Sequence, residues 1–172
     1  VENLTDFQVK VVLDPQTFDY TNVNHNGSDI RFTNSTGTPL PYWIEKWDYN
    51  GVSYIWFKAD YLPSGIKSTF YIYYGNPNAT VSQSDGEDVF EFFDDFNGFS
   101  SDVWEVYPAD SKNISIKNGY LEISNGTAVV TKHDIITDGI IETKAMAVTT
   151  EGDTEASILA RCQKRTPNPL ED

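Results

Sequence analysis

Apolar and polar residues alternate in short runs along most of the chain. Five runs lie in the first half, at residues 7–13, 29–32, 42–47, 52–58 and 68–74. The second half continues the pattern at residues 104–106, 114–116, 121–123, 128–130 and 140–145. Such alternation is typical of half-buried β-strands, and no window shows a sustained helical period. The pattern therefore predicts an all-β protein, with antiparallel β-sandwich or jelly-roll-like modules.

Turn residues between the runs predict two hairpins. Asn50-Gly51 separates residues 42–48 from 52–58, and Asn118-Gly119 separates residues 113–117 from 120–124. Asn and Gly both tolerate the positive φ that a tight two-residue turn requires. Short strands at near-regular spacing with turns of this kind indicate a sandwich or a barrel.

A change of character near the middle of the chain predicts a domain boundary. Residues 77–88 form a polar stretch between two aromatic-rich blocks. Domains commonly run to about 100–150 residues, so a chain of 172 residues has room for one large β-domain or two small ones. We expect two modules, residues 1–80 and 89–172, joined by a linker at 81–88. The end, residues 165–172, has no strand pattern and is expected to fray or to cover a sheet edge.

Charge and cysteine content narrow the classes of partner. The net charge is −14 and the pI is near 4.3, so nucleic acid phosphates and anionic membrane surfaces are repelled. No apolar run is long enough to span a membrane. Cys162 is the single cysteine, which excludes an intrachain disulfide. The acidity fits a soluble surface or one that collects cations.

Three ordered motifs carry a resemblance to a known family. They are Gly-Ser-Asp-Ile-Arg-Phe at residues 27–32, Leu-Pro-Tyr-Trp-Ile-Glu at 40–45 and Tyr-Tyr-Gly-Asn-Pro at 73–77. Together, across residues 3–88, they resemble a domain family of unknown function (DUF2341) found in archaeal and bacterial surface proteins. The resemblance implies an extracellular, cell-surface location and a DUF2341-like β-sandwich over residues 1–80.

A second resemblance begins where the first ends. Phe-Phe-Asp-Asp-Phe at residues 92–96 and Val-Trp-Glu-Val at 103–106 resemble the opening of a concanavalin A-like (LamG or glucanase-type) jelly roll. Such a jelly roll often follows the DUF2341 module. The resemblance implies that residues 89–172 form part of one.

The chain is rich in sequons for N-glycosylation. Six Asn-x-Ser/Thr sequences occur, where average composition leads us to expect about two. Most fall in predicted loops or strand ends, where a glycan would be solvated. The same residue types also favour turns, so a loop-rich β-protein would be enriched in them as well. The predicted glycosylation sites are Asn3, Asn26, Asn34, Asn78, Asn113 and Asn125.

Carboxylates cluster around the predicted boundary. Hard oxygen ligands that lie close in sequence suit Ca²⁺, and jelly-roll folds of the resembled kind often hold a structural Ca²⁺. No spaced EF-hand loop is present, and a solvated acidic linker is the alternative. The candidate metal ligands are Asp85, Glu87, Asp88, Asp94 and Asp95.

Aromatic side chains on the first predicted hairpin are candidates for sugar binding, because aromatic faces pack on the C–H faces of pyranose rings. Trp43 and Trp47 share the parity of one strand face, which predicts that both point into the core. The tyrosines nearby are freer to contact a ligand. The candidate ligand-binding residues are Tyr49, Tyr54 and Tyr61.

These features predict a non-catalytic extracellular glycoprotein module for adhesion, glycan binding or surface assembly, with carbohydrate or other surface proteins as partners. A fragment of a glycoside hydrolase is one alternative, since such an enzyme needs two carboxylates about 5–10 Å apart. By residue type alone its candidates are Glu122, Glu142, Glu151 and Glu155. His25 and His133 are too far apart in sequence to indicate a histidine metal site.

Self-assembly is the second alternative. The resembled family usually begins with a further strand, which has no counterpart before Leu4. Strand 6–13 is then expected at an open sheet edge, where a strand of a second copy adds by main-chain hydrogen bonds. Head-to-tail strand donation of this kind would build filaments.

Overall fold

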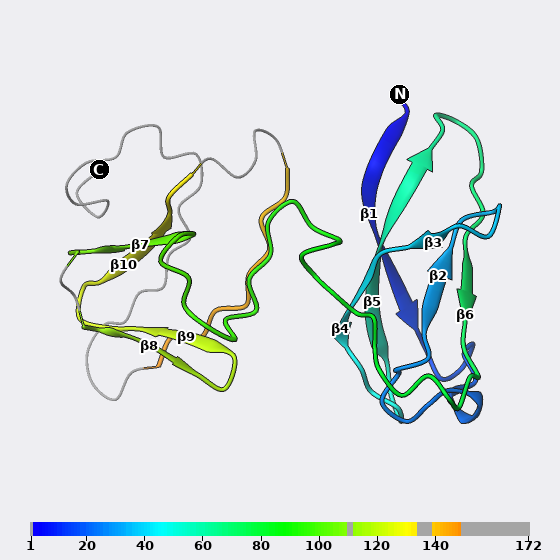
Figure 1. Ribbon diagram of the computed structural model, residues 1–172, viewed down its shortest axis with the longest axis horizontal. Coiled ribbons are helices and arrows are strands. Elements are labelled where there is room, and N and C mark those ends of the chain that lie inside the picture. The colour runs from blue at the N-terminus through cyan, green and yellow to red at the C-terminus, as the bar shows by residue number, and fades with distance from the viewer. Residues whose placement is uncertain (1, 110–111, 134–138, 149–172) are drawn as a thin grey trace. The chain divides into compact units, whose positions relative to one another are not determined.

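The computed structural model describes residues 2–109, 112–133 and 139–148. Contacts divide the chain into two compact units, Val1–Asp94 and Asp95–Asp172. In the described residues the regular elements are β-strands, apart from one turn of 3₁₀ helix, η1 (Tyr20–Asn22) (Figure 1). The predicted all-β fold is therefore confirmed.

The first unit is a β-sandwich of two three-stranded antiparallel sheets (Figure 1). One sheet has the order β1 (Leu4–Leu13), β5 (Ser53–Leu62) and β4 (Tyr42–Lys46). The other has the order β3 (Pro39–Leu40), β2 (Arg31–Thr33) and β6 (Tyr71–Tyr73). Strand β3 was not anticipated from the sequence, because a two-residue strand is too short to show alternation.

The core lies between the two sheets and follows the alternation of β5. Ile55, Phe57 and Ala59 are buried, whereas the residues between them are partly exposed on the outer face. The Phe57 ring stacks on Phe32 of the facing sheet, with 5.1 Å between centroids. Apolar side chains from both layers thus meet in one cluster, and burial of this apolar area holds the layers together.

Trp43 and Trp47, which the alternation places on the same strand face, lie before and after a β-bulge in β4. The register of β4 against β5 shifts between Ile44 and Lys46. Trp47 packs against the core, but Trp43 pairs with Trp56 on the outer face of the sheet. The prediction that Trp43 points inward is wrong, because the bulge inserts one residue and reverses the alternation beyond it.

The two predicted hairpins are both present, with different turns. Residues Asp48 to Gly51 form a four-residue turn closed by the Gly51 N–H on the Asp48 carbonyl at 3.1 Å, and neither Asn50 nor Gly51 has a positive φ. The predicted two-residue turn is wrong there, because the Asp48 side chain accepts from the Asn50 N–H and favours the longer turn. At Asn118-Gly119 the φ values of 52° and 73° match the predicted tight turn.

Residues 82–93 pack along β4 instead of leaving the sandwich. The Asp85 N–H donates to the Tyr42 carbonyl at 2.9 Å, and the Ile44 N–H donates to Ser84 Oγ at 2.8 Å. Val89 is fully buried. Most of the segment expected to be a linker, residues 81–88, therefore covers the open edge of β4, and the first unit extends to Asp94.

The described residues of the second unit form two separate two-stranded ribbons. One pairs β7 (Trp104–Tyr107) with β10 (Ala128–Thr131), and the other pairs β8 (Ile114–Lys117) with β9 (Tyr120–Ile123). The predicted strand at 140–145 is wrong: these residues have no regular structure and are exposed, with no strand of the described chain beside them. The tail at 165–172 lies outside the described residues.

Candidate functional site

One end of the sandwich carries an open hollow of about 460 Å³. The loop after β1 and the turn between β4 and β5 line it. Ligand pockets commonly measure about 300–1,000 Å³, and the hollow lies in this range although it is open to solvent. Its lining residues are Pro15, Gln16, Thr17, Phe18, Asp19, Tyr20, Thr21, Tyr49 and Asn50.

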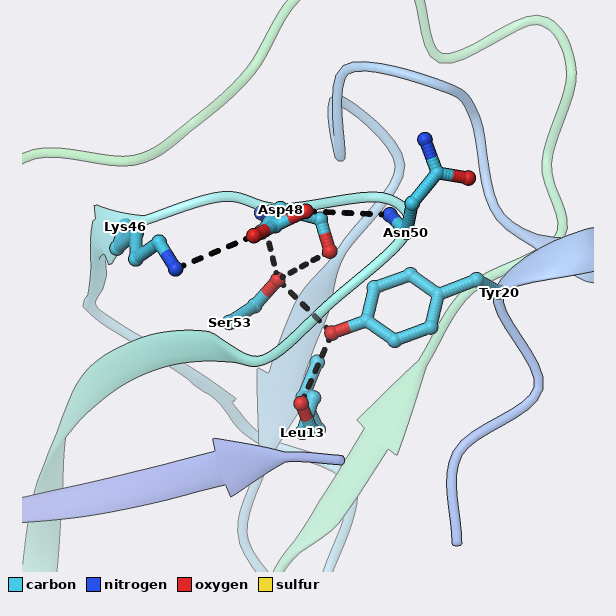
Figure 2. Close-up of polar contacts among 6 residues, drawn as sticks. All are labelled: Leu13, Tyr20, Lys46, Asp48, Asn50 and Ser53. Carbon is cyan, nitrogen blue, oxygen red and sulfur yellow. Dashed lines mark hydrogen bonds and ion pairs between the residues drawn. The ribbon is translucent and has the colours of Figure 1, made fainter. Parts of the chain in front are cut away.

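A hydrogen-bond network fixes the Tyr20 side of the hollow (Figure 2). The buried Tyr20 hydroxyl donates to the Leu13 carbonyl at 2.9 Å and lies 2.8 Å from Ser53 Oγ. Ser53 Oγ accepts from the Asp48 N–H at 2.9 Å. The network thus ties the loop after β1 to the start of β5 and to the adjacent turn. A buried phenol whose hydroxyl is hydrogen-bonded holds its ring in place, so this part of the hollow is preformed.

Aromatic rings, most of them partly or fully buried, pack together beside this network. Tyr49 stacks on His25 with 4.4 Å between ring centroids and an interplanar angle of 23°. Its ring lies 6.0 Å from that of Tyr20 in an edge-to-face arrangement. Phe18 packs edge-on against Tyr20 at 4.9 Å. The hollow therefore combines aromatic surface with rigid support.

Polar groups surround the aromatic rings. The Asp19 carboxylate accepts from the Thr21 hydroxyl at 2.6 Å and from the Thr21 N–H at 3.0 Å, which caps η1. The Thr21 hydroxyl bond, followed by the Thr21 backbone bond, holds the pKa of Asp19 below its ordinary value of 3.8. Asn22 Nδ2 also donates to the Asp19 carboxylate, at 2.7 Å. Asp19 is ionised at neutral pH, and these three bonds leave about one of its lone-pair positions for an incoming hydroxyl group.

The three motifs of the family resemblance meet in a buried polar network elsewhere in the first unit. The buried Asp29 carboxylate accepts from the N–H groups of Gly75 at 2.6 Å and Asn76 at 3.2 Å, and from the Asn24 N–H at 3.0 Å. Arg31 donates to the Ser28 and Ile30 carbonyls, at 2.9 and 2.6 Å.

Arg31 also reaches the Tyr42 hydroxyl, at 3.3 Å. The described chain contains no buried side-chain polar atom without a partner. The motif side chains in this network therefore hold loops together.

The structure does not bring the three candidate tyrosines together. Tyr49 lines the hollow. Tyr54 lies on the outer face of the β1–β5–β4 sheet, with Lys10 Nζ 4.9 Å from its ring centroid. Tyr61 is exposed near the far end of β5, opposite Thr5. A single tyrosine platform is therefore absent, and Tyr49 alone belongs to the hollow.

The predicted glycosylation sites lie in different surroundings. Asn3, Asn26, Asn78 and Asn125 are exposed, whereas Asn34 and Asn113 are partly buried. The Asn125 side-chain amide donates to Asn113 Oδ1 at 3.3 Å. Their occupancy stays a prediction.

The predicted metal ligands do not form a cluster. Asp85, Glu87, Asp88 and Asp95 are exposed, and Asp94 is partly exposed. Within residues 2–109, 112–133 and 139–148, no three His, Cys, Asp or Glu side chains are arranged to hold a metal ion. Ca²⁺ binding by this segment stays a prediction.

Two of the carboxylates considered for glycoside hydrolysis, Glu122 and Glu142, lie among the described residues. Glu122 bonds to Lys117 on the β8–β9 ribbon at 2.6 Å, and Glu142 is exposed. Glu151 and Glu155 lie outside the described residues.

The sequence interpretation missed the loop that forms most of the hollow, residues 15–21. A local signal was present: Asp19 precedes Thr21 and Asn22, and Asp-x-Thr is a common capping pattern at the start of a helical turn. Nothing local, however, indicates that this loop meets the turn at Tyr49.

The fold and hollow define an all-β sandwich domain with a ligand-sized depression at one end. Residues 26–107 match the family described as a domain of unknown function (DUF2341), which confirms that part of the resemblance. The match covers β2 to β7, and the jelly roll expected to follow it stays a prediction. Searches of curated proteins and of solved structures found no match. Among the described residues, no helix is long and apolar enough to cross a membrane.

Proposed function

We propose that this chain is a non-catalytic, extracellular cell-surface glycoprotein module that binds carbohydrate in the hollow of its first unit. The supporting observation is the partly buried Tyr49 ring, which lines the hollow, stacks on His25 and has polar groups beside it. Sugars need an aromatic surface for their C–H faces and fixed hydrogen-bonding groups for their hydroxyls. Asp19 and Asn50 supply such groups at the same hollow.

An oligosaccharide array followed by calorimetric titration of the best ligand tests this proposal. Tyr49→Ala removes the aromatic surface and should weaken binding by up to about tenfold, since an aromatic contact contributes on the order of 0.5–1.5 kcal/mol. Tyr61→Ala is the matched control, because Tyr61 is a tyrosine outside the hollow. Equal affinity of the two variants would contradict the site.

Tyr49 also packs beside the core, so its replacement carries a risk of misfolding. Asn50→Ala is the safer second variant, because Asn50 is exposed and its side-chain amide makes no hydrogen bond within the described chain. Weaker binding by Asn50→Ala, with an unchanged circular dichroism spectrum, would assign the loss to the hollow.

A second candidate function, self-assembly by strand addition, draws on the position of β1. This ten-residue strand pairs with β5 on one side and is the edge of its sheet. The opposite edge of the sheet, β4, is covered by residues 84–85. An open edge offers unpaired N–H and C=O groups to a strand of a second copy.

Sedimentation at micromolar concentration tests self-assembly. Val12 is 54% exposed on β1, and Val12→Lys places a charge on that edge strand, which disfavours pairing. Val81→Lys, at a residue 74% exposed outside any strand, is the control for added charge. Association that Val12→Lys abolishes and Val81→Lys preserves supports the edge. A monomeric wild-type chain would refute it.

A further inference from the structure

Of the four sequons in the first unit, those at Asn34 and Asn78 differ most in the hydrogen bonds that their side chains make. An N-glycan is attached to the Nδ2 atom of the asparagine, and the hydroxyl at the third position of the sequon is part of the signal. Both groups must be reachable in a folded acceptor. Asn34-Ser35-Thr36 and Asn78-Ala79-Thr80 meet this requirement to very different degrees.

Both the nitrogen and the oxygen of the Asn34 side-chain amide are hydrogen-bonded in the turn between β2 and β3. Its Nδ2 donates to the Asp60 carboxylate at 2.7 Å. Its Oδ1 accepts from the Thr36 N–H at 3.0 Å, from the Thr36 hydroxyl at 2.8 Å and from the Thr38 N–H at 3.0 Å. Asn34 is also partly buried. The nucleophilic nitrogen and the signal hydroxyl are therefore both held in internal bonds.

Asn78 has the opposite character. It is exposed in the loop after β6, and its backbone N–H bonds to Asn76 Oδ1 at 3.0 Å. Its side-chain amide makes no hydrogen bond within the described chain. Thr80 is exposed too, and only its backbone N–H is bonded, to the Asn78 carbonyl at 3.0 Å. The loop thus presents a free amide and a free hydroxyl to solvent.

We propose that the folded chain accepts an N-glycan at Asn78 and not at Asn34. The donor is a lipid-linked oligosaccharide diphosphate. Asn78 Nδ2 attacks the C1 atom of the first sugar and loses one proton to a base of the transferase. The N–C1 bond forms, the C1–O bond breaks, and the lipid diphosphate leaves with the bonding electrons. This inference rests on the proposed extracellular glycoprotein role.

In-vitro glycosylation of the purified full chain tests the proposal. The folded chain is incubated with an oligosaccharyltransferase and a lipid-linked oligosaccharide, and occupancy at each sequon is measured by mass spectrometry. A bond from an amide to a carboxylate contributes about 1.5 kcal/mol or more, so Asn34 should be modified at least about tenfold less than Asn78. Thr80→Ala should abolish the Asn78 product.

A digest of the same chain is the matched control. Cleavage after lysine separates residues 11–46, with Asn34, from residues 68–112, with Asn78. In the digest the preference for Asn78 should fall by about tenfold, because the Asp60 bond is lost. Modification of Asn34 equal to that of Asn78 in the folded chain would overturn the proposal. So would an unmodified Asn78, or a preference that digestion leaves unchanged. None of these outcomes depends on whether the hollow binds sugar.

Discussion

The two units share an alternating sequence pattern but differ in how it is used. In the first unit two sheets face each other, and Ile30, Ile55 and Val89 are 0% exposed between and beside them. In the second unit the described strands form two ribbons, and no described residue is buried. Isolated two-stranded ribbons are at best marginally stable in water. Alternation of apolar and polar residues is therefore enough to form a strand, but a buried core requires a second layer of structure packed on that strand.

The buried core of the first unit also matters for the proposed binding site. The hollow depends on Tyr20, whose hydroxyl is anchored to β1 and β5 of the sandwich. A preformed site needs supporting elements that do not rearrange when a ligand binds. The first unit supplies such support, and the described ribbons of the second unit have no comparable buried anchor.

The largest expected effect is a core truncation in the first unit. Ile55→Ala should lower the free energy of unfolding of that unit by about 2–5 kcal/mol, because it leaves a cavity at a fully buried site. Val130→Ala on β10, where the side chain is only partly buried, should cost about 1 kcal/mol or less. Guanidinium denaturation followed by near-UV circular dichroism measures both. Equal losses would show that the two units are built alike.

Two glycines, one in each unit, test the difference in packing between the units with a smaller expected effect. Gly27 and Gly126 have similar positive φ values, 70° and 66°. A Cβ at Gly27 would lie 2.9 Å from the Trp47 ring, whereas nothing lies within 4 Å of one at Gly126. Gly126→Ala should therefore cost only the left-handed strain of about 1–2 kcal/mol.

Gly27→Ala should cost about 1–3 kcal/mol more than that, because it adds overpacking against Trp47. The same denaturation experiment reports the difference. If the two variants lose equal stability, the close approach of Gly27 to the Trp47 ring adds no overpacking cost.

The smallest effect concerns one carboxylate in each unit. The Lys117 hydrogen bond lowers the pKa of Glu122 on the β8–β9 ribbon, and the Thr21 hydroxyl bond lowers the pKa of Asp19 at the hollow. A carboxylate with a lowered pKa in the folded state stabilises the protein above its unfolded pKa. For Glu122 the contribution is present above about pH 4.5 and is lost as the pH falls through the folded value.

Lys117→Met should raise the pKa of Glu122 toward 4.5, and Thr21→Val should raise the pKa of Asp19 toward 3.8. Each substitution should leave the other carboxylate unchanged. NMR titration of the side-chain carboxyl carbons measures both values. If the pKa of a carboxylate does not change, the hydrogen bond that its variant removes is not what lowers that pKa.

Local patterns predicted the strands better than their surroundings. The pairing of residues 42–48 with 52–58 followed from alternation and turn residues. The outward position of Trp43 did not, because a bulge changes the parity and leaves no mark on composition. Residues 140–145 have the composition of a strand but no partner strand in the described chain. A strand pattern is local, whereas pairing depends on distant residues.

The candidate site shows the same limit. Tyr49 was predicted as a ligand contact, with Tyr54 and Tyr61, because the tryptophans of the same hairpin were expected to point into the core. The loop at residues 15–21 was missed, since its approach to Tyr49 depends on how β1 pairs with β5. The sequence thus indicated Tyr49 on one side of the hollow, whereas the loop on the other side could be placed only from the folded sandwich.

Residue-resolved NMR titration with the best oligosaccharide from the array tests carbohydrate binding by the hollow most directly. Backbone amide signals of residues 16–21 and 49–50 should shift on binding, while those of the ribbons at 104–107 and 114–123 should stay in place. Shifts confined to the ribbons, or centred on Tyr61, would contradict carbohydrate binding by the hollow, as would the absence of any shift.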